Sequence, residues 1–480
     1  MTFSLRSNSL LIQCLAFWAL SLLTAVSDAA PPNVILFVTD DQSPDIGAYG
    51  NTAIKTPSMD ELAADGVRFP NAFCTTASCS ASRSVILSGL HNHHNGQYGH
   101  QHAYHHFSAF DYVKSLPVRI SEAGYESIRI GKYHVAPESV FQFDHELKAN
   151  ARNPVQMAET VGAYLDRRDN TEPFFLYFCT SDPHRSGGRR DDLEHAPNPF
   201  GNKQEGYPGV ESVYYDPAEV IVPSFLPDTP VARAEIAMYY ESISRIDQGL
   251  GKLVKELKAR DLYDNTAIIF TSDHGMAFPG AKTNLYEPGM RVPMIVRHPA
   301  IKDRGTVNDA LVSHVDLAPT ILEMADASKT ANPKKAFHGR SWLPVLLKPG
   351  MKGWNEVFAS HTFHEIQMYY PMKVVRGRKY KLIWNVAHQL PYPFASDLWA
   401  APTWKDRYEK GMETKYGLKT VGQYIQRERF ELFDIENDPD ETTNLAEKPE
   451  HSELLQQMKD KLKQYQKKTK DPWIIKWDYE

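Results

Sequence analysis

Four pairs of polar residues each follow a short apolar run in this chain. The pairs are Asp40 with Asp41, Lys132 with His134, Asp182 with His184, and Asp273 with His274. The runs before them, 33–39, 127–131, 174–178 and 267–271, are typical of strands buried on both faces of a parallel sheet. Ligands of α/β proteins bind beyond the carboxyl ends of such strands. We therefore expect the four pairs to converge on one site.

The acidic residues of these pairs indicate a divalent metal ion. Asp40, Asp41 and Asp273 offer carboxylate oxygens, which suit hard cations such as Ca²⁺ or Mg²⁺. A single Asp after a strand often caps a helix instead, but a doublet with a third Asp after another strand favours metal binding. His274 adds an imidazole, which would also accept a softer ion such as Mn²⁺.

The elements that must hold these residues alternate between strand and helix. Helical patterns lie between the runs and after them, at 58–65, 84–88, 232–260 and 313–325. This order predicts a doubly wound α/β sheet flanked by helices. The segments 186–230 and 389–415 are expected to be surface loops that form the wall of a pocket and determine which substrate it prefers.

A change of pattern after about residue 350 predicts a second part of the chain. Alternating strands are expected within 373–384 and at 430–434, and a charged helix is expected at 451–468. We predict a catalytic domain over 31–350 and a smaller α+β subdomain over 351–480.

Composition places the 480-residue chain among ordinary globular proteins. Hydrophobic residues make up 42% and charged residues 23%, and the formal net charge is -6. Without a basic excess, non-specific nucleic-acid binding is not expected. After the N-terminal segment only Cys74, Cys79 and Cys179 remain, too few for a disulfide framework.

The N-terminal 30 residues have the pattern of a secretory signal peptide. An apolar run at 10–26 follows Arg6 and precedes the small residues Ser27, Ala29 and Ala30. An uncleaved anchor is the alternative, because the run approaches the length that spans a bilayer. Cleavage is favoured, which leaves a protein without a stable membrane span. The chain after residue 30 has no Asn-x-Ser/Thr acceptor, which favours a secreted or periplasmic bacterial protein.

Two motifs resemble the signatures of the sulfatase family. Cys79-Ser80-Ala81-Ser82-Arg83, followed by Leu87-Ser88-Gly89, is similar to the first signature, with Ala81 where the family has proline. The segment 124–134 resembles the second signature almost position for position. Further likeness to the heparan N-sulfatase branch runs through 33–99, 105–107, 110–111, 182–185, 283–286, 364–365, 370–372 and 471–473.

This resemblance implies an alkaline-phosphatase-like fold and a set of site residues. It implies that a formylglycine-generating or anaerobic sulfatase-maturing enzyme converts Cys79 to formylglycine, whose hydrated aldehyde supplies the attacking oxygen. The implied metal ligands, with Ca²⁺ as the first choice, are Asp40, Asp41, Cys79, Asp273 and His274. The other implied catalytic residues are Arg83, Lys132, His134, His184 and Lys282.

The expected substrate is a sulfated saccharide, with the N-sulfate of glucosamine in heparan-type glycans as first choice. The resemblance points to His105 and His106 beside the sugar, and His364 and Glu365 are weaker substrate-binding candidates. A zinc site in the His-rich segment 91–106 is not expected from the spacing of its histidines, and a pocket wall is favoured. The relatives suggest a homodimer.

Three alternatives stay open. The chain could be an O-sulfatase acting on another polysaccharide. It could hydrolyse phosphonate monoesters or phosphodiesters, because Asp273-His274 also resembles such formylglycine hydrolases. Without maturation of Cys79, it could be a non-catalytic protein that binds sulfated glycans.

Overall fold

The first strand lies at the centre of the main sheet. A computed structural model describes residues 31–168, 172–327, 336–348 and 350–479. All seven residues of β1 (Asn33–Thr39) are buried, and β1 pairs in parallel with β6 (Phe174–Cys179) and β7 (Thr266–Ser272). Phe37 stacks on Phe178 with ring centroids 4.6 Å apart. This packing confirms the prediction of strands buried on both faces.

Within the described residues the main sheet has eight strands in the order β5-β4-β6-β1-β7-β8-β2-β9. The five from β5 to β7 run parallel, and β8 is antiparallel to its neighbours β7 and β2. The other strands of this sheet are β4 (Glu126–Gly131), β5 (His145–Leu147), β8 (Met294–Arg297), β2 (Val67–Arg68) and β9 (Thr306–Val307). The sheet is therefore mixed, as the family resemblance implies.

The four strands predicted from the apolar runs lie side by side as β4-β6-β1-β7. Backbone hydrogen bonds continue beyond the strands: Asp40 N donates to Asp182 O at 3.0 Å, and Asp273 N donates to Thr39 O at 3.0 Å. The polar pairs consequently begin at one common edge of the sheet.

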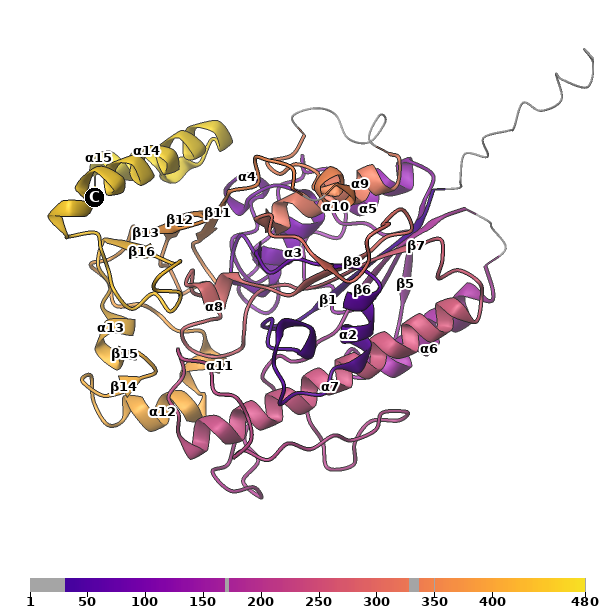
Figure 1. Ribbon diagram of the computed structural model, residues 1–480, viewed down its shortest axis with the longest axis horizontal. Helices are drawn as coiled ribbons and strands as arrows, with labels where there is room; N and C mark the ends of the chain where they lie inside the picture. The colour runs from indigo at the N-terminus through magenta and orange to yellow at the C-terminus, as the bar shows by residue number, and fades with distance from the viewer. Residues whose placement is uncertain (1–30, 169–171, 328–335, 349, 480) are drawn as a thin grey trace, which may run out of the picture. The chain divides into compact units, whose positions relative to one another are not determined.

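Helices cover both faces of the main sheet (Figure 1). One face carries α2 (Pro57–Ala64), α6 (Pro154–Leu165) and α7 (Pro230–Lys258), and the other carries α3 (Cys79–Ser88), α5 (Leu116–Glu122) and α9 (Leu317–Met324). The side chain of Thr229 accepts from Ala232 N, and Pro230 follows it as the first helical residue, which explains where α7 begins. The doubly wound prediction is confirmed.

Helix α3 starts earlier than the sequence pattern predicts. We expect a helix at 84–88, whereas α3 begins at Cys79. Its first turn consists of small residues, Cys79 to Ser82, so apolar periodicity does not reveal it. The consequence for the site is that Cys79 is the first residue of a helix.

A second, antiparallel sheet follows residue 350 in the chain. It has the order β11-β12-β13-β16, formed by Glu356–His361, Met372–Gly377, Tyr380–Asn385 and Phe430–Asp434. Helix α14 (Ser452–Thr469) packs on it, with Tyr465 stacked on Phe358 at 3.7 Å between ring centroids. These strands and this helix confirm the predicted elements, while the boundary at residue 350 stays a prediction.

The remaining elements are short. They are η1 (Gly47–Tyr49), β3 (Ala72–Phe73), α4 (Asn92–Asn95), α8 (Glu287–Met290), β10 (Val312–Ser313), η2 (His314–Asp316), α10 (Leu343–Leu347), α11 (Ser396–Trp399), α12 (Pro402–Tyr408), β14 (Lys415–Tyr416), β15 (Lys419–Thr420), α13 (Val421–Ile425), η3 (Pro449–His451), η4 (Pro472–Ile475) and α15 (Lys476–Tyr479). The segment 180–229 contains neither helix nor strand, as predicted.

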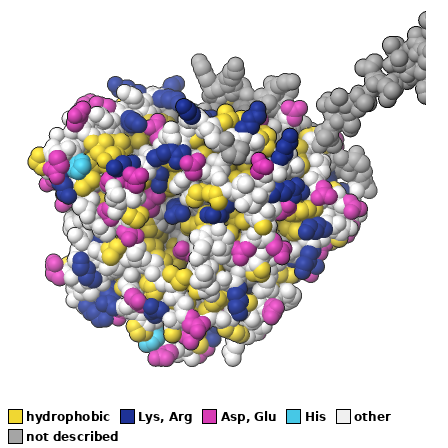
Figure 2. Space-filling view, in the orientation of Figure 1, with side chains coloured by type: hydrophobic (Ala, Val, Ile, Leu, Met, Phe, Trp, Pro, Cys, Tyr) yellow, Lys and Arg dark blue, Asp and Glu magenta, His cyan; other side chains and the backbone are white. Residues whose placement is uncertain are grey.

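The surface carries both signs of charge. Figure 2 shows Lys and Arg side chains interspersed with Asp and Glu on the face drawn. Across the part of the chain that the structure describes, no helix combines the length and apolar character needed to cross a bilayer. The predicted signal peptide, 1–30, lies outside the described residues.

Candidate active site

Three carboxylates from two neighbouring strands meet at the carboxyl edge of the main sheet. Asp40 and Asp41 follow β1, Asp273 follows β7, and all three are fully buried. One oxygen of each lies within 4.8 Å of the others. Asp273 Oδ1 accepts from Asp41 N at 3.0 Å and from His274 N at 2.9 Å, which fixes its position. The predicted convergence of these aspartates is therefore found.

Three cationic side chains balance this acidic cluster. Arg83 Nε donates to Asp273 Oδ2 at 3.1 Å, and its Nη2 lies 3.5 Å from Asp40 Oδ1. Lys132 Nζ pairs with Asp40, and Lys282 Nζ lies 3.0 Å from Asp41 Oδ2. Arg83 is thus directed to two of the three carboxylates.

The pKa values of the cluster follow from burial opposed by these cations. Burial acts to raise the pKa of Asp40, but Lys132, then His184 and Arg83, hold it well below the usual range. Burial acts against ionisation of Asp41 too, and Lys282 outweighs it, so its pKa is lowered. Burial and the neighbouring Asp40 raise the pKa of Asp273 to about 6.

These donors fit a hard divalent cation. Three carboxylates crowd together out of water, and the His274 imidazole lies with its Nε2 3.0 Å from Asp41 Oδ1. A divalent ion between them would relieve their mutual repulsion and favour the ionised form of Asp273. Oxygen donors of this kind suit Ca²⁺ or Mg²⁺.

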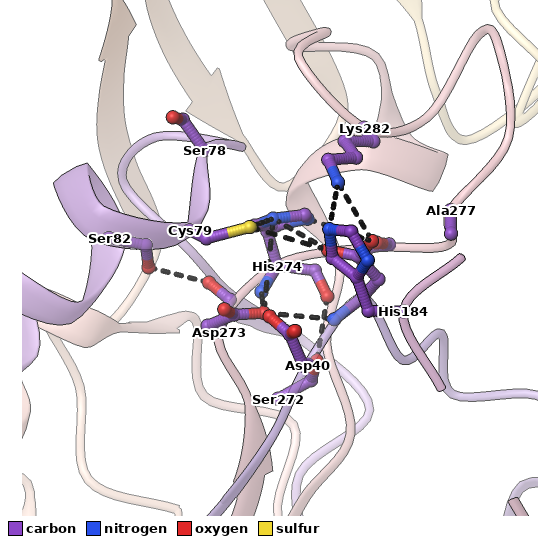
Figure 3. Close-up of polar contacts among 12 residues, drawn as sticks. Asp40, Ser78, Cys79, Ser82, His184, Ser272, Asp273, His274, Ala277 and Lys282 are labelled. Carbon is purple, nitrogen blue, oxygen red and sulfur yellow. Dashed lines mark hydrogen bonds and ion pairs between the residues drawn. The ribbon is translucent and has the colours of Figure 1, made fainter. Parts of the chain in front are cut away.

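Cys79 lies directly beside this acidic cluster. Figure 3 shows its sulfur extending from the first turn of α3 toward His274. Cys79 Sγ is 3.3 Å from His274 Nε2 and 3.7 Å from Asp41 Oδ1. Burial raises the pKa of the Cys79 thiol despite the nearby Lys132 and Lys282. An unmodified thiol here would stay protonated and be a weak nucleophile.

Polar side chains behind the cluster hold its backbone in place. Ser82 Oγ donates to Asp273 O at 2.5 Å and lies 3.1 Å from His314 Nδ1. Ser272 Oγ accepts from Gln42 N at 2.8 Å and donates to His274 O at 2.8 Å. No spacing in the sequence reveals these supports, because all but the Ser272–His274 contact link residues more than 180 positions apart.

His184 and Lys282 form a second group with a residue that sequence reasoning missed. Lys282 Nζ is 3.0 Å from His184 Nε2 and 2.9 Å from Asp397 Oδ2. His184 Nδ1 lies 2.6 Å from Arg185 O, which places the proton on Nδ1 and leaves Nε2 facing the site. Asp397 lies in 389–415, a segment expected to wall the pocket, which is the signal that could have found it.

The Asp182 carboxylate lies apart from the acidic cluster and from the His184–Lys282 group. It is fully buried, with Arg152 Nη1 at 2.6 Å from one oxygen and Arg245 at 2.7 Å from the other. Of the pair that follows β6, only His184 faces the acidic cluster. The expectation that all four pairs converge is therefore correct for three pairs and for one member of the fourth.

A cavity of about 460 Å³ opens above this site. Its lining includes seven residues predicted from the sequence: His105 and the six residues Lys132, His134, His184, Lys282, His364 and Glu365. The predicted His106 is exposed and is not part of the lining. Lining residues that we did not predict individually are His100, His102, Tyr104, Gln367, Ser396 and Asp397. The His-rich segment thus contributes to a pocket wall, as expected.

His364 and Glu365 are held by neighbours on the wall. His364 Nδ1 lies 2.9 Å from Ser78 Oγ, next to the start of α3. Glu365 Oε1 accepts from Ser396 N at 3.0 Å and from Ser396 Oγ at 2.6 Å. These contacts tie the wall to the segment that carries Asp397.

Asp397 is expected to position Lys282 and His184. Asp397→Asn removes the charge that holds Lys282, so we expect kcat to fall about tenfold to a hundredfold with a smaller change in KM. Steady-state kinetics would measure both constants, and Asp397→Glu should recover part of kcat. Asp406→Asn is the matched control, because Asp406 on α12 is similarly exposed and pairs with Lys410. Equal losses in Asp397→Asn and in the control would contradict the positioning role.

Two family models match the chain. The model described as Sulfatase matches residues 32–327, and the model described as N-sulphoglucosamine sulphohydrolase, C-terminal, matches residues 276–403. The first covers more than half of the chain, and the two overlap across the segment that carries Lys282.

Individual proteins give the same result. Human N-sulphoglucosamine sulphohydrolase is 39% identical over 475 residues, covering 95% of this chain and 94% of the human protein. An ulvan-active sulfatase from Formosa agariphila is 28% identical, covering 89% of this chain and 78% of that protein. A solved protein in complex with its substrate D-glucosamine-2-N,6-O-disulfate has a TM-score of 0.66 at 21% identity, covering 92% and 99% of the two chains. That last likeness concerns the fold.

Proposed function

Because this chain belongs to the sulfatase family, we propose that it hydrolyses the N-sulfate group of glucosamine in heparan-type glycans. Sulfate hydrolysis follows from the family, and the proposal concerns the substrate and the residues that act on it. Similarity to the human N-sulphoglucosamine sulphohydrolase along almost its whole length supports this substrate.

The observation that carries the proposal is the position of Cys79. It is buried beside the acidic cluster, 3.3 Å from His274 Nε2, and its cationic neighbours Lys132 and Lys282 line the cavity. A sulfamate carries negative charge, so cations at this place favour its binding and the charge that develops during transfer.

We propose that Cys79 is matured to formylglycine, whose hydrate supplies the oxygen nucleophile when present. Asp40, Asp41, Asp273 and His274, with the modified residue 79, would hold the divalent cation, with Ca²⁺ as first choice over Mg²⁺ or Mn²⁺. The cation would supply electrostatic stabilisation of the transferring group. Arg83 holds two of the carboxylates in position through its contacts with Asp273 and Asp40.

His184 is the proposed proton donor to the leaving nitrogen. Its Nε2 faces the cavity beside Lys282, and an amine leaves poorly unless it gains a proton. Burial, followed by Lys282, lowers the pKa of His184. A bound anionic sulfamate would oppose this effect and favour the protonated imidazole that donation requires.

His134, which lines the same cavity, is the proposed base. Burial, then Lys132, holds the pKa of His134 well below its usual range, so its imidazole is neutral and able to accept a proton. His105, His364 and Glu365 are proposed to contact the sugar from the same cavity. His106 is proposed to contact only a larger substrate that extends beyond the cavity, because its side chain is exposed outside the lining.

Maturation and location follow as parts of the same proposal. Cys79 is fully buried, so a formylglycine-generating or anaerobic sulfatase-maturing enzyme would need to act before the chain folds. We propose secretion or a periplasmic location after removal of 1–30, and a homodimer as the assembled state.

The proposal is tested by measuring sulfate release from matched substrates. N-sulfated glucosamine should be hydrolysed with a kcat/KM about a hundredfold or more above that of its 6-O-sulfated isomer. A sulfate ester and a phosphate ester with one leaving group should favour the sulfate. Faster O-sulfate hydrolysis would identify an O-sulfatase, and preference for the phosphate ester would identify a phosphohydrolase. Binding without release would identify a glycan-binding protein.

A further inference from the structure

Four histidines from three separate segments meet on one wall of the cavity. His100 and His102 come from the His-rich segment, His134 follows β4, and His364 follows β11. The ligand nitrogens of the first three lie within 4.8 Å of one another. His102 Nδ1 is 2.7 Å from His134 Nε2, and His100 Nε2 is 2.9 Å from His364 Nε2. Spacing along the chain does not indicate this meeting of side chains.

The cluster consists of neutral imidazoles. His100 and His364 are 6% and 1% exposed, and burial holds the pKa of each well below its usual range. His134 behaves in the same way, and burial also lowers the pKa of the more exposed His102. Neutral imidazole keeps a lone pair on one nitrogen, which is the form that binds metal ions.

Hydrogen bonding within the protein does not satisfy this cluster. Among the described residues, the nitrogens of the two close pairs have only each other as hydrogen-bond partners, and the second ring nitrogens of His100 and His134, both Nδ1, are buried without a partner. Lys132 and Lys282 lie nearby, but each is paired with a carboxylate, Asp40 and Asp41 respectively. Glu365 contributes a favourable negative charge near His102. The wall therefore offers nitrogen donors for a cation, and the positive charges of the nearby lysines are balanced by carboxylates.

We propose that His100, His102, His134 and His364 form a second metal site, which binds Zn²⁺ or a similar late transition-metal ion. Nitrogen donors select such ions, whereas the acidic cluster beside Cys79 offers oxygen donors that suit Ca²⁺ or Mg²⁺. Zn–N bonds of about 2.0–2.1 Å place tetrahedral ligand nitrogens roughly 3.3 Å apart. The two close pairs would open by roughly half an ångström, and the exposed His102 has room to move.

An ion at this site would control turnover. It would bind the nitrogen of His134 that the proposed mechanism needs for proton transfer, and it would narrow the cavity above Cys79. Zn²⁺ should therefore inhibit the enzyme reversibly even when the acidic cluster is saturated with Ca²⁺. A chelator that prefers Zn²⁺ should restore activity without removing Ca²⁺.

Metal binding itself tests the proposal independently of activity. The full chain, saturated with Ca²⁺, is dialysed against Zn²⁺ and analysed for bound metal, and Co²⁺ is added to a second sample for absorption spectroscopy. We expect one Zn²⁺ per chain and a Co²⁺ spectrum typical of tetrahedral nitrogen ligation. His100→Ala and His102→Ala should each weaken Zn²⁺ binding by about a hundredfold or more.

Three variants exclude other binding sites. His106→Ala is the matched control from the same segment, and it should bind Zn²⁺ like the parent because His106 is exposed outside the cavity. Asp273→Asn and Cys79→Ala should also keep the Zn²⁺, which separates this site from the acidic cluster and from the thiol. Zn²⁺ that survives His100→Ala with His102→Ala in a folded protein, or that disappears in Asp273→Asn, would overturn the proposal. So would the absence of Zn²⁺ binding in the parent.

Discussion

Cys79→Ala should reduce the rate of sulfate release by on the order of 10⁴-fold or more while the protein stays folded. The substitution removes the atom from which the proposed nucleophile is made, and the described residues that line the cavity include no cysteine that could replace it. Cys79 Sγ lies beside His274 and Asp41, and Cys79 is not part of the apolar core, so its loss leaves that core intact. Inorganic sulfate release and thermal unfolding would measure the two effects.

Cys74→Ala is the matched control for this substitution. Cys74 is also fully buried, and its Sγ donates to Gly289 O at 3.5 Å away from the cavity lining. Its activity should stay within a few-fold of the parent. Parent-like turnover in Cys79→Ala would refute the proposed nucleophile, and so would an equal loss in both variants.

Asp273→Ala should remove the divalent cation and activity together. Asp273 is the residue that ties the acidic cluster together, because it accepts from Asp41 N and His274 N and pairs with Arg83. Removing it also leaves Arg83 buried beside Asp40 alone, at a cost of about 3–5 kcal/mol in stability. Asp273→Asn keeps the shape of the side chain and should lose metal with a smaller loss of stability.

Metal analysis of purified protein would be compared with sulfate release for both Asp273 variants. Asp247→Asn serves as the control. Asp247, on α7, is also buried, but its carboxylate accepts from Ser58 N and Met59 N at 3.1 and 2.7 Å and contacts none of the cluster residues in those hydrogen bonds. It should keep bound metal and turnover. Full turnover in a metal-free Asp273 variant would show that the cation is not needed.

The centre of the main sheet was predictable because β1, β6 and β7 are almost continuously apolar. The runs that became β1, β4, β6 and β7 each stop at polar residues, so both the strands and the edge that carries the site follow from the pattern. The start of α3 was not predictable in this way, because the small residues after Ser78 give no helical periodicity.

The acidic and basic members of the site were predictable from motifs, but their partners were not. Asp40, Asp41 and Asp273 come together with Cys79 as expected. Asp397 pairs with Lys282 across 115 residues, and His364 meets His100 across 264 residues. Such contacts depend on how the C-terminal part packs on the main sheet, which local patterns do not encode.

The Asp182 carboxylate illustrates the reverse error. Its position after β6 and its place beside His184 suggest a role in the site, yet two arginines bind it behind the cavity. A motif fixes the position of the backbone at the end of a strand, whereas neighbouring side chains decide which way each residue points.

Mass spectrometry of the peptide that contains Cys79 tests the central claim most directly. The protein should be produced in a host with sulfatase-maturing machinery, shown to release sulfate, and then digested. We expect the fraction of peptide with an aldehyde at residue 79 to rise in proportion to activity. That peptide should show the mass loss expected when the CH₂SH group of cysteine becomes an aldehyde. A preparation that turns over while residue 79 is entirely unmodified cysteine would contradict the account.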